Sequence, residues 1–541
     1  MNRDNLKHYI SKDVHVEFSQ NAGIFEVPVS RIKEVAHDLH SKNCSLKLIT
    51  ATDERKEQGC FKIWYVFGAP TEHSFIIPYI QLKNTEQFPS ISSVIRGSWN
   101  YERKIQTFFG LIPVGHPDPR PIILHENWPE NLYPLQKNVP WNTRPKDAQR
   151  NEENLSLPAD KSNKNGETRR TYTFQEVGGE GMYEIPVGPI HAGIIEPGHF
   201  RFSVAGEEII LLEPRLGFTH KGSEKLFETL PPNDMARLSE KISGDSSFSH
   251  SLAFCQALEQ LSDVIAPKRA RYLRVIYAEL ERLANHCGDI GAIMIDTGFN
   301  FGGANGARLR EMVMRLNERL TGSRFLRGVN VRGGVTKDIG IEEKQMLSSD
   351  LAHLLKDFSE VMKIAENSAS LLNRLKGTGV LSYKIAVDHG ATGIAAKAVG
   401  LKNDARIDFP YAAYDEIHLN TVETEESGDV YARFQVRIKE VRASIKLIEQ
   451  ALKTLPDGPI ETKTTGIFKK NAVDISVVEG WRGEILYFLK TDSLGNIERV
   501  APRDPSFVNW SLLGYAGAHN VVPDFPLINK SFNLSYTGND L

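Results

Sequence analysis

Cysteine is scarce in this sequence: Cys44, Cys60, Cys255 and Cys287 are the only four among 541 residues. No two of them form a C-x-x-C pair, which argues against a zinc or iron–sulfur motif and against a disulfide framework. We expect four buried free thiols, because that is the usual state of cysteine in cytosolic proteins.

Long apolar runs and an excess of one charge are also absent. No run of about 18 apolar residues occurs, so we expect no membrane-spanning helix. Residues 1–10 lack the apolar core of a signal peptide, which predicts a cytoplasmic location. The formal net charge of -3 includes no basic excess, and we expect no nucleic-acid partner. A length of 541 residues with 40% hydrophobic residues predicts two to three globular domains.

Residues 1–140 predict a small α/β domain. The hydrophobic pattern predicts a helix at 31–40 and strands at 45–52, Cys60–Ala69 and Ser74–Leu82. The next segment, 141–175, is polar and has too few aliphatic side chains to offset the entropy of ordering it. We expect a linker there.

Residues 176–541 predict a second, mainly helical domain with peripheral antiparallel strands, so the fold class is α+β. Apolar residues recur in steps of three and four along the long helical segments. The predicted elements are a hairpin at 200–204 and 208–212, helices at 264–290, 341–376 and 429–455, and strands within 475–491. Gly302, Gly303 and Gly306 form neither a dinucleotide fingerprint nor a P-loop, and we expect a loop that enters a helix.

A specific pattern lies in the first domain. Glu102 and Arg103 precede the loop 115–120 (GHPDPR), and residues 134–137 (PLQK) follow. This stretch resembles the 30 kDa subunit of respiratory complex I and its hydrogenase counterparts. Lys104 and Thr107 depart from that pattern, which usually has acids there. The resemblance implies a scaffold domain without a cofactor.

The second domain resembles the large subunit of nickel–iron hydrogenases and the 49 kDa subunit of complex I, from about Tyr183 onward. The matching stretches include 188–191, 196–201, 279–286, 332–335 and 478–484. The resemblance is to the membrane-bound, energy-converting branch, and fusion to a 30 kDa-like domain occurs in formate hydrogenlyase-type complexes. It implies a hydrogenase-type helical fold.

The metal ligands of that family do not carry over. Hydrogenases hold nickel and iron with four cysteines, and the resemblance places these on Ser243, Ser246, Ser535 and Gly538. A serine hydroxyl is a hard, neutral donor near neutral pH, whereas soft metals bind thiolates. We therefore expect no nickel and no metal ligands in this chain.

Candidate catalytic residues remain around these positions. Glu196 matches a hydrogenase proton-relay glutamate and would act as a partly buried carboxylate with a raised pKa; the alternative is a salt bridge to Arg201. His199, His250 and His286 are expected to line the same cleft, and the alternative for each is a structural histidine with satisfied hydrogen bonds.

Two further candidates, Asp245 and Arg482, are charged. Two others, Gly244 and His191, are candidates for binding a quinone. Asp245 lies inside the former metal clamp and is expected to cap a helix, pair with Arg482 or bind a proton. Arg482 matches an arginine above the metal centre, with roles in binding an anion or quinone oxygen or in a buried ion pair. Gly244 stands at the position of the quinone-binding tyrosine of complex I, and His191 lies near the position of its histidine. We count both as cofactor-binding candidates.

Two functions from different classes follow from the resemblance. In the first, this chain is an oxidoreductase subunit whose cleft binds a quinone-like acceptor, and an iron–sulfur cluster in a partner small subunit supplies the electrons. In the second, it is a catalytically inactive scaffold that docks the small subunit and antiporter-like membrane subunits and couples ion movement. Both predict a hetero-oligomer on the inner face of the cell membrane.

Overall fold

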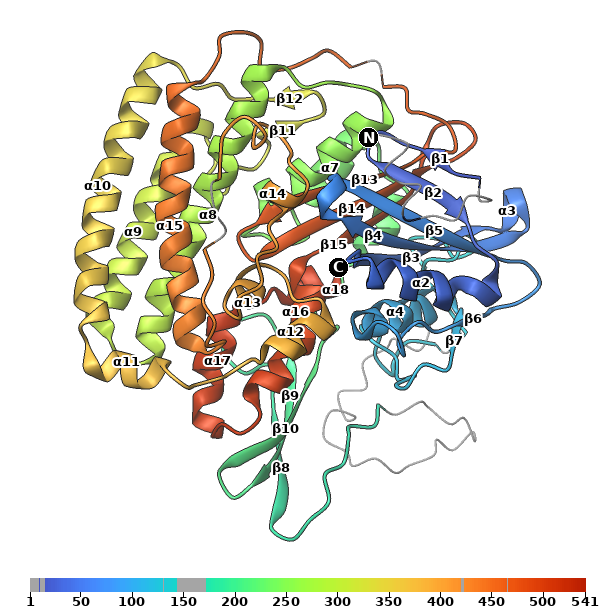
Figure 1. Cartoon of the computed structure of the whole chain (residues 1–541), viewed down its shortest axis with the longest axis horizontal. Helices are drawn as coiled ribbons and strands as arrows, with labels where there is room; N and C mark the ends of the chain where they lie inside the picture. Colours follow the sequence, from blue (N-terminus) through green and yellow to red (C-terminus); the bar gives the residue numbers. More distant parts are fainter. Residues whose placement is uncertain (1–8, 10–14, 130, 144–171, 420–422, 465) are drawn as a thin grey trace.

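The computed structural model describes residues 9, 15–129, 131–143, 172–419, 423–464 and 466–541. Most of the predicted linker 141–175 lies outside the described residues. Figure 1 shows a sheet-rich region that contains the N-terminal residues, a layer of long helices on the opposite side, and a hairpin that projects away from both. The predicted α+β fold class is confirmed.

The N-terminal domain is built on a mixed five-stranded sheet of order β1-β2-β5-β4-β3. Its strands are β1 (Glu17–Phe18), β2 (Ala22–Glu26), β3 (Ser45–Glu54), β4 (Cys60–Ala69) and β5 (Ser74–Leu82). The β2–β5 pair is parallel and the others are antiparallel. Two helices, α2 (Ile32–Ser41) and α4 (Trp99–Phe109), complete the domain. The predicted helix and three strands are confirmed, whereas β2 and α4 were not predicted.

The loop 115–120 joins this domain to the second one. Arg120 donates to both carboxylate oxygens of Asp118, at 2.8 and 2.9 Å, and its Nη1 lies 2.6 Å from Glu213 in strand β10 (Glu208–Arg215) of the second domain. Glu102 is buried behind the loop and accepts from the Ile91 amide at 2.7 Å. Its burial raises its pKa to about 7. These motif residues hold the loop in place.

Four long helices form the helical layer: α8 (Lys268–Asp296), α9 (Asn300–Thr321), α10 (Ile341–Glu366) and α15 (Val430–Lys453). Most of their apolar side chains are buried in one core. The predicted helix at 429–455 is confirmed, with Asp429 as its N-cap. The single helix predicted at 341–376 is wrong, because it breaks at Asn367 and restarts as α11 (Ala369–Leu375), where the Ser368 hydroxyl accepts from the Leu371 amide.

The glycines expected in a loop lie inside α9 instead. A Cβ on Gly306 would come within 2.4 Å of the Gly291 Cα in α8, and a Cβ on Gly303 within 2.1 Å of the Ile295 side chain. The two helices therefore cross with their backbones in contact, and this packing outweighs the low helix propensity of glycine.

A buried antiparallel sheet lies between the two regions. It consists of β13 (Val473–Gly480), β14 (Gly483–Thr491) and β15 (Ile497–Arg503), and nearly every residue in it is buried. On one side α7 (Ser247–Leu261) covers it, and on the other it shares a core with the N-terminal sheet, where Trp64 packs on Phe488. This sheet is therefore central rather than peripheral.

A peripheral sheet does exist, in the projecting hairpin of Figure 1. It is formed by β8 (Met182–Val187), β9 (His199–Ala205) and β10 (Glu208–Arg215), and it confirms the predicted hairpin. The C-terminal helix α16 (Pro505–Gly517) packs on β10, and α17 (Phe525–Phe532) and α18 (Tyr536–Asp540) pack on α16.

The remaining elements are α3 (Arg55–Gln58), β6 (Gln87–Pro89), β7 (Ile112–Val114), α5 (Ser223–Phe227), α6 (Pro232–Ser239), β11 (Asn330–Val331), β12 (Gly334–Val335), α12 (Tyr383–His389), α13 (Gly393–Lys397) and α14 (Ala405–Asp408).

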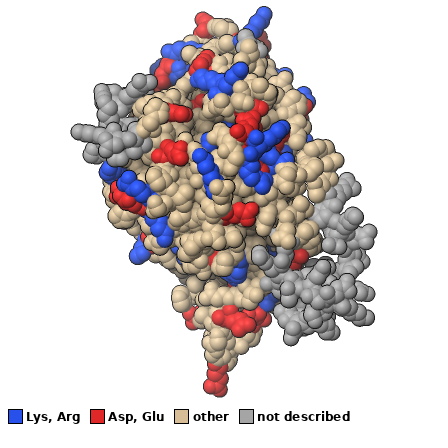
Figure 2. All heavy atoms as spheres, turned by 90° about the vertical axis from the view of Figure 1, so that its right-hand side faces the viewer, with Lys and Arg blue, Asp and Glu red and all other residues tan. Residues whose placement is uncertain are grey.

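The surface and the cysteines agree with the composition. Figure 2 shows basic and acidic side chains interspersed on the side that carries the N-terminal sheet, without a field of one sign. All four cysteines are buried and free. Among the described residues, no helix combines the length and apolarity that crossing a membrane requires.

We predict that Gly306→Leu weakens the α8–α9 crossing. A side chain there must push the two backbones apart, and overpacking of this kind costs about 1–3 kcal/mol. The free energy of unfolding in urea measures the loss. Ala307→Leu, one residue along on the exposed face of the same helix, is the matched control and should change stability by no more than about 0.5 kcal/mol. Equal effects of the two substitutions would contradict the account.

Candidate functional site

The positions where the resemblance places four cysteines come together in space. Ser243 and Ser246 lie in the turn before α7, and Ser535 and Gly538 lie at the start of α18. The Ser243 hydroxyl donates to the Ser535 hydroxyl at 2.9 Å, although the two residues are 292 positions apart. The Gly538 amide donates to the Ser535 hydroxyl at 2.9 Å and so caps α18. We call these four residues the serine cluster.

A guanidinium group lies against the serine cluster. Arg482 stands in the two-residue turn between β13 and β14, which pairs Gly480 with Gly483. Its Nη1 lies 3.4 Å from the hydroxyls of both Ser243 and Ser246. A Cβ on Gly483 would meet the Gly393 backbone at 2.8 Å, so this tight turn depends on glycine.

Asp245 pairs with this guanidinium in a bidentate geometry. The two Asp245 oxygens lie 2.6 and 2.7 Å from Nη1 and Nη2 of Arg482. Burial raises the pKa of Asp245, but the charge and hydrogen bonds of Arg482 outweigh burial, so the pKa lies below its ordinary value. Of the roles expected for Asp245, the geometry selects pairing with Arg482, and both groups stay ionised at neutral pH.

These residues do not fit a nickel–iron centre. The donor set consists of neutral hydroxyls and a glycine, and a cation already lies among them. Gly538 has no room for a thiolate, because a Cβ there would come within 2.6 Å of the Asp504 carboxyl carbon. Among the described residues, no group of three or more His, Cys, Asp or Glu side chains has a geometry that could hold a metal ion.

His250 and His286 are both fully buried. His250 lies between the Tyr487 hydroxyl and the Asp504 carboxylate, at 3.0 Å from each. His286 places Nε2 at 3.1 Å from Glu440. For His250, the structural alternative is supported, because both ring nitrogens have partners within the protein.

Glu196 and His199 differ from expectation. Glu196 is exposed rather than partly buried, and its carboxylate accepts from the Thr537 amide at 3.0 Å. Arg201, its expected salt-bridge partner, pairs with Glu184 instead, at 2.6 Å. The physical reason is that Arg201 in β9 is paired with Pro186 in β8, two residues from Glu184 on the same strand, whereas Glu196 lies in the loop between these strands. His199 is half-buried, with Nδ1 at 3.3 Å from the Gly188 carbonyl.

His191 lies beside a tyrosine that the sequence did not indicate. Its Nε2 is 3.3 Å from the hydroxyl of Tyr536, which lies in α18 between Ser535 and Gly538 of the serine cluster. Gly244, the other cofactor-binding candidate, is half-buried, and a Cβ there would meet only the Arg327 side chain, at 3.5 Å. The structure therefore brings a tyrosine and a histidine together, but from other positions than those of the family pattern.

The loop that carries His191 and Glu196 exposes apolar side chains. Ile194 is fully exposed and Ile190 is 83% exposed. The loop is closed at its base, where the Gly198 amide donates to the Pro189 carbonyl at 2.9 Å and a Cβ on Gly188 would come within 2.2 Å of the Gly198 carbonyl. The loop therefore presents two isoleucine side chains to solvent.

Sequence reasoning missed Tyr536, Asp504 and Lys221. The Lys221 ammonium contacts the Thr537 hydroxyl and the Lys241 carbonyl, so it neighbours the serine cluster. Asp504 caps α16 through the Ser506 amide at 2.7 Å and holds His250. An acid immediately before a proline at a helix start was the available signal for Asp504.

We predict that the charges of Asp245 and Arg482 are energetically coupled. In a double-mutant cycle of Asp245→Asn, Arg482→Gln and the double variant, the free energy of unfolding should show a coupling of about 1–3 kcal/mol, because each single change leaves one charge without its partner. The matched cycle on the exposed pair Lys384 and Asp388 should show about 0.5 kcal/mol or less. A coupling of zero at Asp245 and Arg482 would contradict the assignment.

Comparison with known proteins identifies two matching family models. Residues 25–145 match the 30 kDa subunit of respiratory-chain NADH dehydrogenase. Residues 296–476 match the 49 kDa subunit of the same enzyme. The matches fall on the N-terminal sheet domain and on the helical layer with β13.

Similar curated proteins carry both parts in one chain. Hydrogenase-4 component G of Escherichia coli is 32% identical over 92% of this chain and 83% of that protein, and formate hydrogenlyase subunit 5 of the same organism is 31% identical over 95% and 88%. The C/D-type NADH-quinone oxidoreductase subunit of Phocaeicola vulgatus is 29% identical over 80% and 83%.

A solved structure shares the fold. A chain of the membrane-bound sulfane sulfur reductase, an archaeal respiratory membrane complex, matches with a TM-score of 0.63 and 25% identity, over 67% of this chain and 99% of that chain. The relatives are thus subunits of hydrogenase and respiratory complexes. This chain belongs to the family of subunits in which a 30 kDa-type domain is fused to a 49 kDa-type domain. Members of this family are related both to complex I and to the hydrogenase large subunits.

Proposed function

We propose that this chain is a peripheral subunit of a membrane-bound complex related to complex I and to energy-converting hydrogenases. It holds no nickel–iron centre. It passes electrons from an iron–sulfur cluster in a partner subunit to a quinone-like acceptor, and this transfer is coupled to proton or ion translocation.

The observation that carries this proposal is the pair formed by His191 and Tyr536. A quinone offers two carbonyl oxygens, and a tyrosine hydroxyl and a histidine ring N–H are suitable donors for them. Tyr536 lies in α18 between Ser535 and Gly538 of the serine cluster, and His191 lies in the loop that exposes Ile190 and Ile194. An apolar surface next to two polar donors suits a molecule with a polar head and an apolar tail.

The electrons must come from another subunit. Cys44, Cys60, Cys255 and Cys287 are buried singly, and burial raises the pKa of the Cys255 and Cys287 thiols to about 12. Thiols of this kind do not ligate an iron–sulfur cluster, which needs thiolates gathered at one place. We propose an iron–sulfur small subunit and antiporter-like membrane subunits as partners, on the cytoplasmic face of the membrane.

One observation favours the alternative of an inactive scaffold. Arg482 and Asp245 satisfy each other, and His250 has a partner at each ring nitrogen, so the centre of the serine cluster offers no free reactive group. In that case the subunit would transmit conformational change between its partners without redox chemistry.

We predict that the purified assembly shows an iron–sulfur signal by electron paramagnetic resonance that disappears when a quinone is added. Tyr536→Phe removes one hydrogen-bond donor to the quinone, and a lost hydrogen bond of about 1–1.5 kcal/mol raises the KM for quinone about tenfold. The signal of the reduced cluster should stay unchanged in this variant.

Tyr383→Phe is the control, because Tyr383 is an exposed tyrosine on α12. It should leave the KM unchanged. An assembly without any cluster signal would refute electron transfer and favour the scaffold. A cluster that quinone oxidises equally fast in wild type and Tyr536→Phe would refute the role of the tyrosine.

A further inference from the structure

Eight ionisable side chains form one connected cluster in the middle of the molecule, apart from the serine cluster. All are buried, with at most 5% of any side chain exposed. They come from α8, α13, α14, α15 and β13. We call them the buried ion cluster, which consists of Glu279, Arg282, His286, Lys397, Asp404, Arg406, Glu440 and Glu479.

Lys397 is the hub of the buried ion cluster. Its ammonium lies 2.7 Å from Asp404, 2.5 Å from Glu440 and 3.4 Å from Glu479. Three carboxylates around one ammonium repel one another, and this repulsion is strong where water is excluded. Further cations are therefore needed nearby.

Two arginines supply them. Arg406 donates to both oxygens of Asp404, at 2.9 and 2.7 Å, and lies 3.1 Å from Glu279. Arg282 lies 3.1 Å from Glu279 and 3.2 Å from Glu440. Glu279 also accepts from Tyr414 and Ser444, each at 2.5 Å. Three of the four carboxylates are thus held by an arginine.

The charges of the buried ion cluster do not balance. Four carboxylates face three cations, which leaves one negative charge when His286 is neutral. A neighbouring pair, Arg437 and Asp289, contributes nothing to the balance because the two neutralise each other at 2.9 Å. An uncompensated charge at such a depth is costly, and binding one proton removes it.

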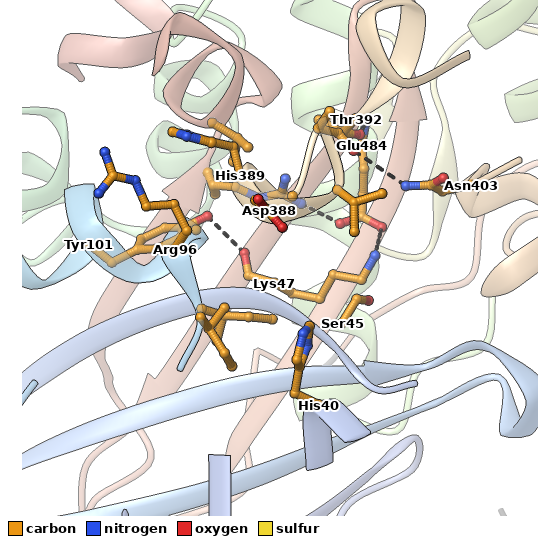
Figure 3. Close-up of a pocket in the computed structure, with 18 of the residues that line it drawn as sticks. His40, Ser45, Lys47, Arg96, Tyr101, Asp388, His389, Thr392, Asn403 and Glu484 are labelled. Carbon is orange, nitrogen blue, oxygen red and sulfur yellow. Dashed lines mark hydrogen bonds and ion pairs between the residues drawn. The ribbon is translucent and has the colours of Figure 1, made fainter. Parts of the chain in front are cut away.

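A cavity connects this cluster to the domain boundary. It has a volume of about 330 Å³, and Asp404 and Glu479 form part of its wall. Figure 3 shows Lys47 and Arg96 of the N-terminal domain and His389 of the second domain among the residues that line the cavity, with the Lys47 ammonium 2.7 Å from Glu484. The cavity is partly open and polar, and a volume of this size holds on the order of ten waters at about 30 Å³ each.

We propose that the buried ion cluster is a proton-binding site that holds one exchangeable proton and that exchanges it with solvent through the cavity between the two domains. This site lies wholly within the chain. The proposal therefore does not rest on the proposed electron transfer.

Glu479 is the carboxylate that carries the proton at rest. It is the one without an arginine contact, and its ammonium contact is the longest of the three around Lys397, with one backbone donor, the Ala405 amide, at 3.0 Å. Burial and the nearby Asp404 charge raise its pKa to about 7. The charged and titratable groups that face Glu479 from the packed elements are Lys397, Asp404, Arg406, Tyr411, Arg282, Glu279 and Glu440.

His286 is the second position for the proton. Its Nε2 contacts Glu440, and its buried Nδ1 has no hydrogen-bond partner. Burial keeps the pKa of His286 below its ordinary value, so the ring is neutral at rest. Glu479 gives its proton to Lys397 as Lys397 gives one to Glu440, and Glu440 gives one to Nε2 of His286, whose resting hydrogen is on Nδ1. Transfer leaves a carboxylate on Glu479 and an imidazolium on His286, and no electron moves.

Movement to His286 carries positive charge toward the serine cluster. The His286 ring lies 6.1 Å from the Trp481 ring, and Trp481 donates from Nε1 to the Asp245 carbonyl at 3.1 Å. The chain from Glu479 through Lys397 and Glu440 to His286 thus links the cavity with the residues around Arg482.

The test measures the carboxylic-acid carbonyl stretch of the full chain by infrared difference spectroscopy across pH. We expect wild type to lose carboxylic-acid bands as pH rises through about 7, from Glu479, Glu281 and Glu102, and Glu479→Gln to lack one of these bands. Glu281→Gln is the matched control: Glu281 is a second buried carboxyl whose burial raises its pKa to about 7, outside the buried ion cluster. The Glu281→Gln substitution should leave the carbonyl band of Glu479 in place.

Unfolding gives a second readout with a definite sign. A carboxyl whose pKa is raised on folding binds more protons folded than unfolded, so its contribution makes stability fall as pH rises from about 4.5 to about 7 and stay constant above. Glu479→Gln should lose less stability than wild type over this pH window. The slope of its free energy of unfolding against pH should differ from the wild-type slope by up to one proton. An unchanged band and slope in Glu479→Gln would overturn the proposal.

The route through the cavity has its own test. Ser93 is exposed at the cavity, and Ser93→Trp should slow the deuterium shift of the Glu479 band severalfold while the Glu281 band shifts at its wild-type rate. Equal rates in wild type and Ser93→Trp would overturn the route. If Glu479→Gln does not fold, Glu440→Gln takes its place as the test variant. It also leaves three carboxylates facing three cations in the buried ion cluster, so it should likewise lose one titrating proton.

Discussion

A guanidinium and a carboxylate lie together where the resemblance to hydrogenases would place four cysteines. The Arg482–Asp245 pair is bidentate, and it rests on a tight turn between two buried strands and on a serine from the turn before α7. Arg482 is buried, whereas 34% of the Asp245 side chain is exposed, so the pair loses only part of its hydration. That cost is offset only if the geometry is good and the remaining hydrogen-bonding groups are satisfied. The turn before α7, the β13–β14 hairpin and α18 therefore have to meet at one place, which fixes the arrangement of the second domain.

The two domains are joined by more than the chain between them. The N-terminal sheet shares an apolar core with β13–β15, and Lys47 of β3 reaches Glu484 of β14, which also contacts Arg503. The cavity at this boundary is lined by both domains, so a change in their relative position would alter access to Asp404 and Glu479. A boundary of this kind suits a subunit that transmits a change between partners.

Much of the fold could be predicted from the local pattern of hydrophobic and polar residues. The helix at 429–455 and the strands of the N-terminal sheet follow from hydrophobic period, and the four positions of the serine cluster follow from the order of motifs. The break at Asn367 carried no proline or glycine as a signal. The glycines of α9 looked like a loop because the partner that makes them favourable, Gly291, lies on another helix. Tyr536 and His191 are 345 residues apart, and no local pattern shows that they meet.

Nickel quantification tests the central claim most directly. The assembly, purified from cells supplied with nickel, is analysed by mass spectrometry of its metals, and the nickel is counted per copy of this chain. The account predicts far less than one nickel per chain, because hydroxyls, a glycine and the Arg482–Asp245 pair stand where four thiolates would be needed. One nickel per chain, with nickel–sulfur bonds seen by X-ray absorption and lost on mutation of the serine cluster, would contradict it.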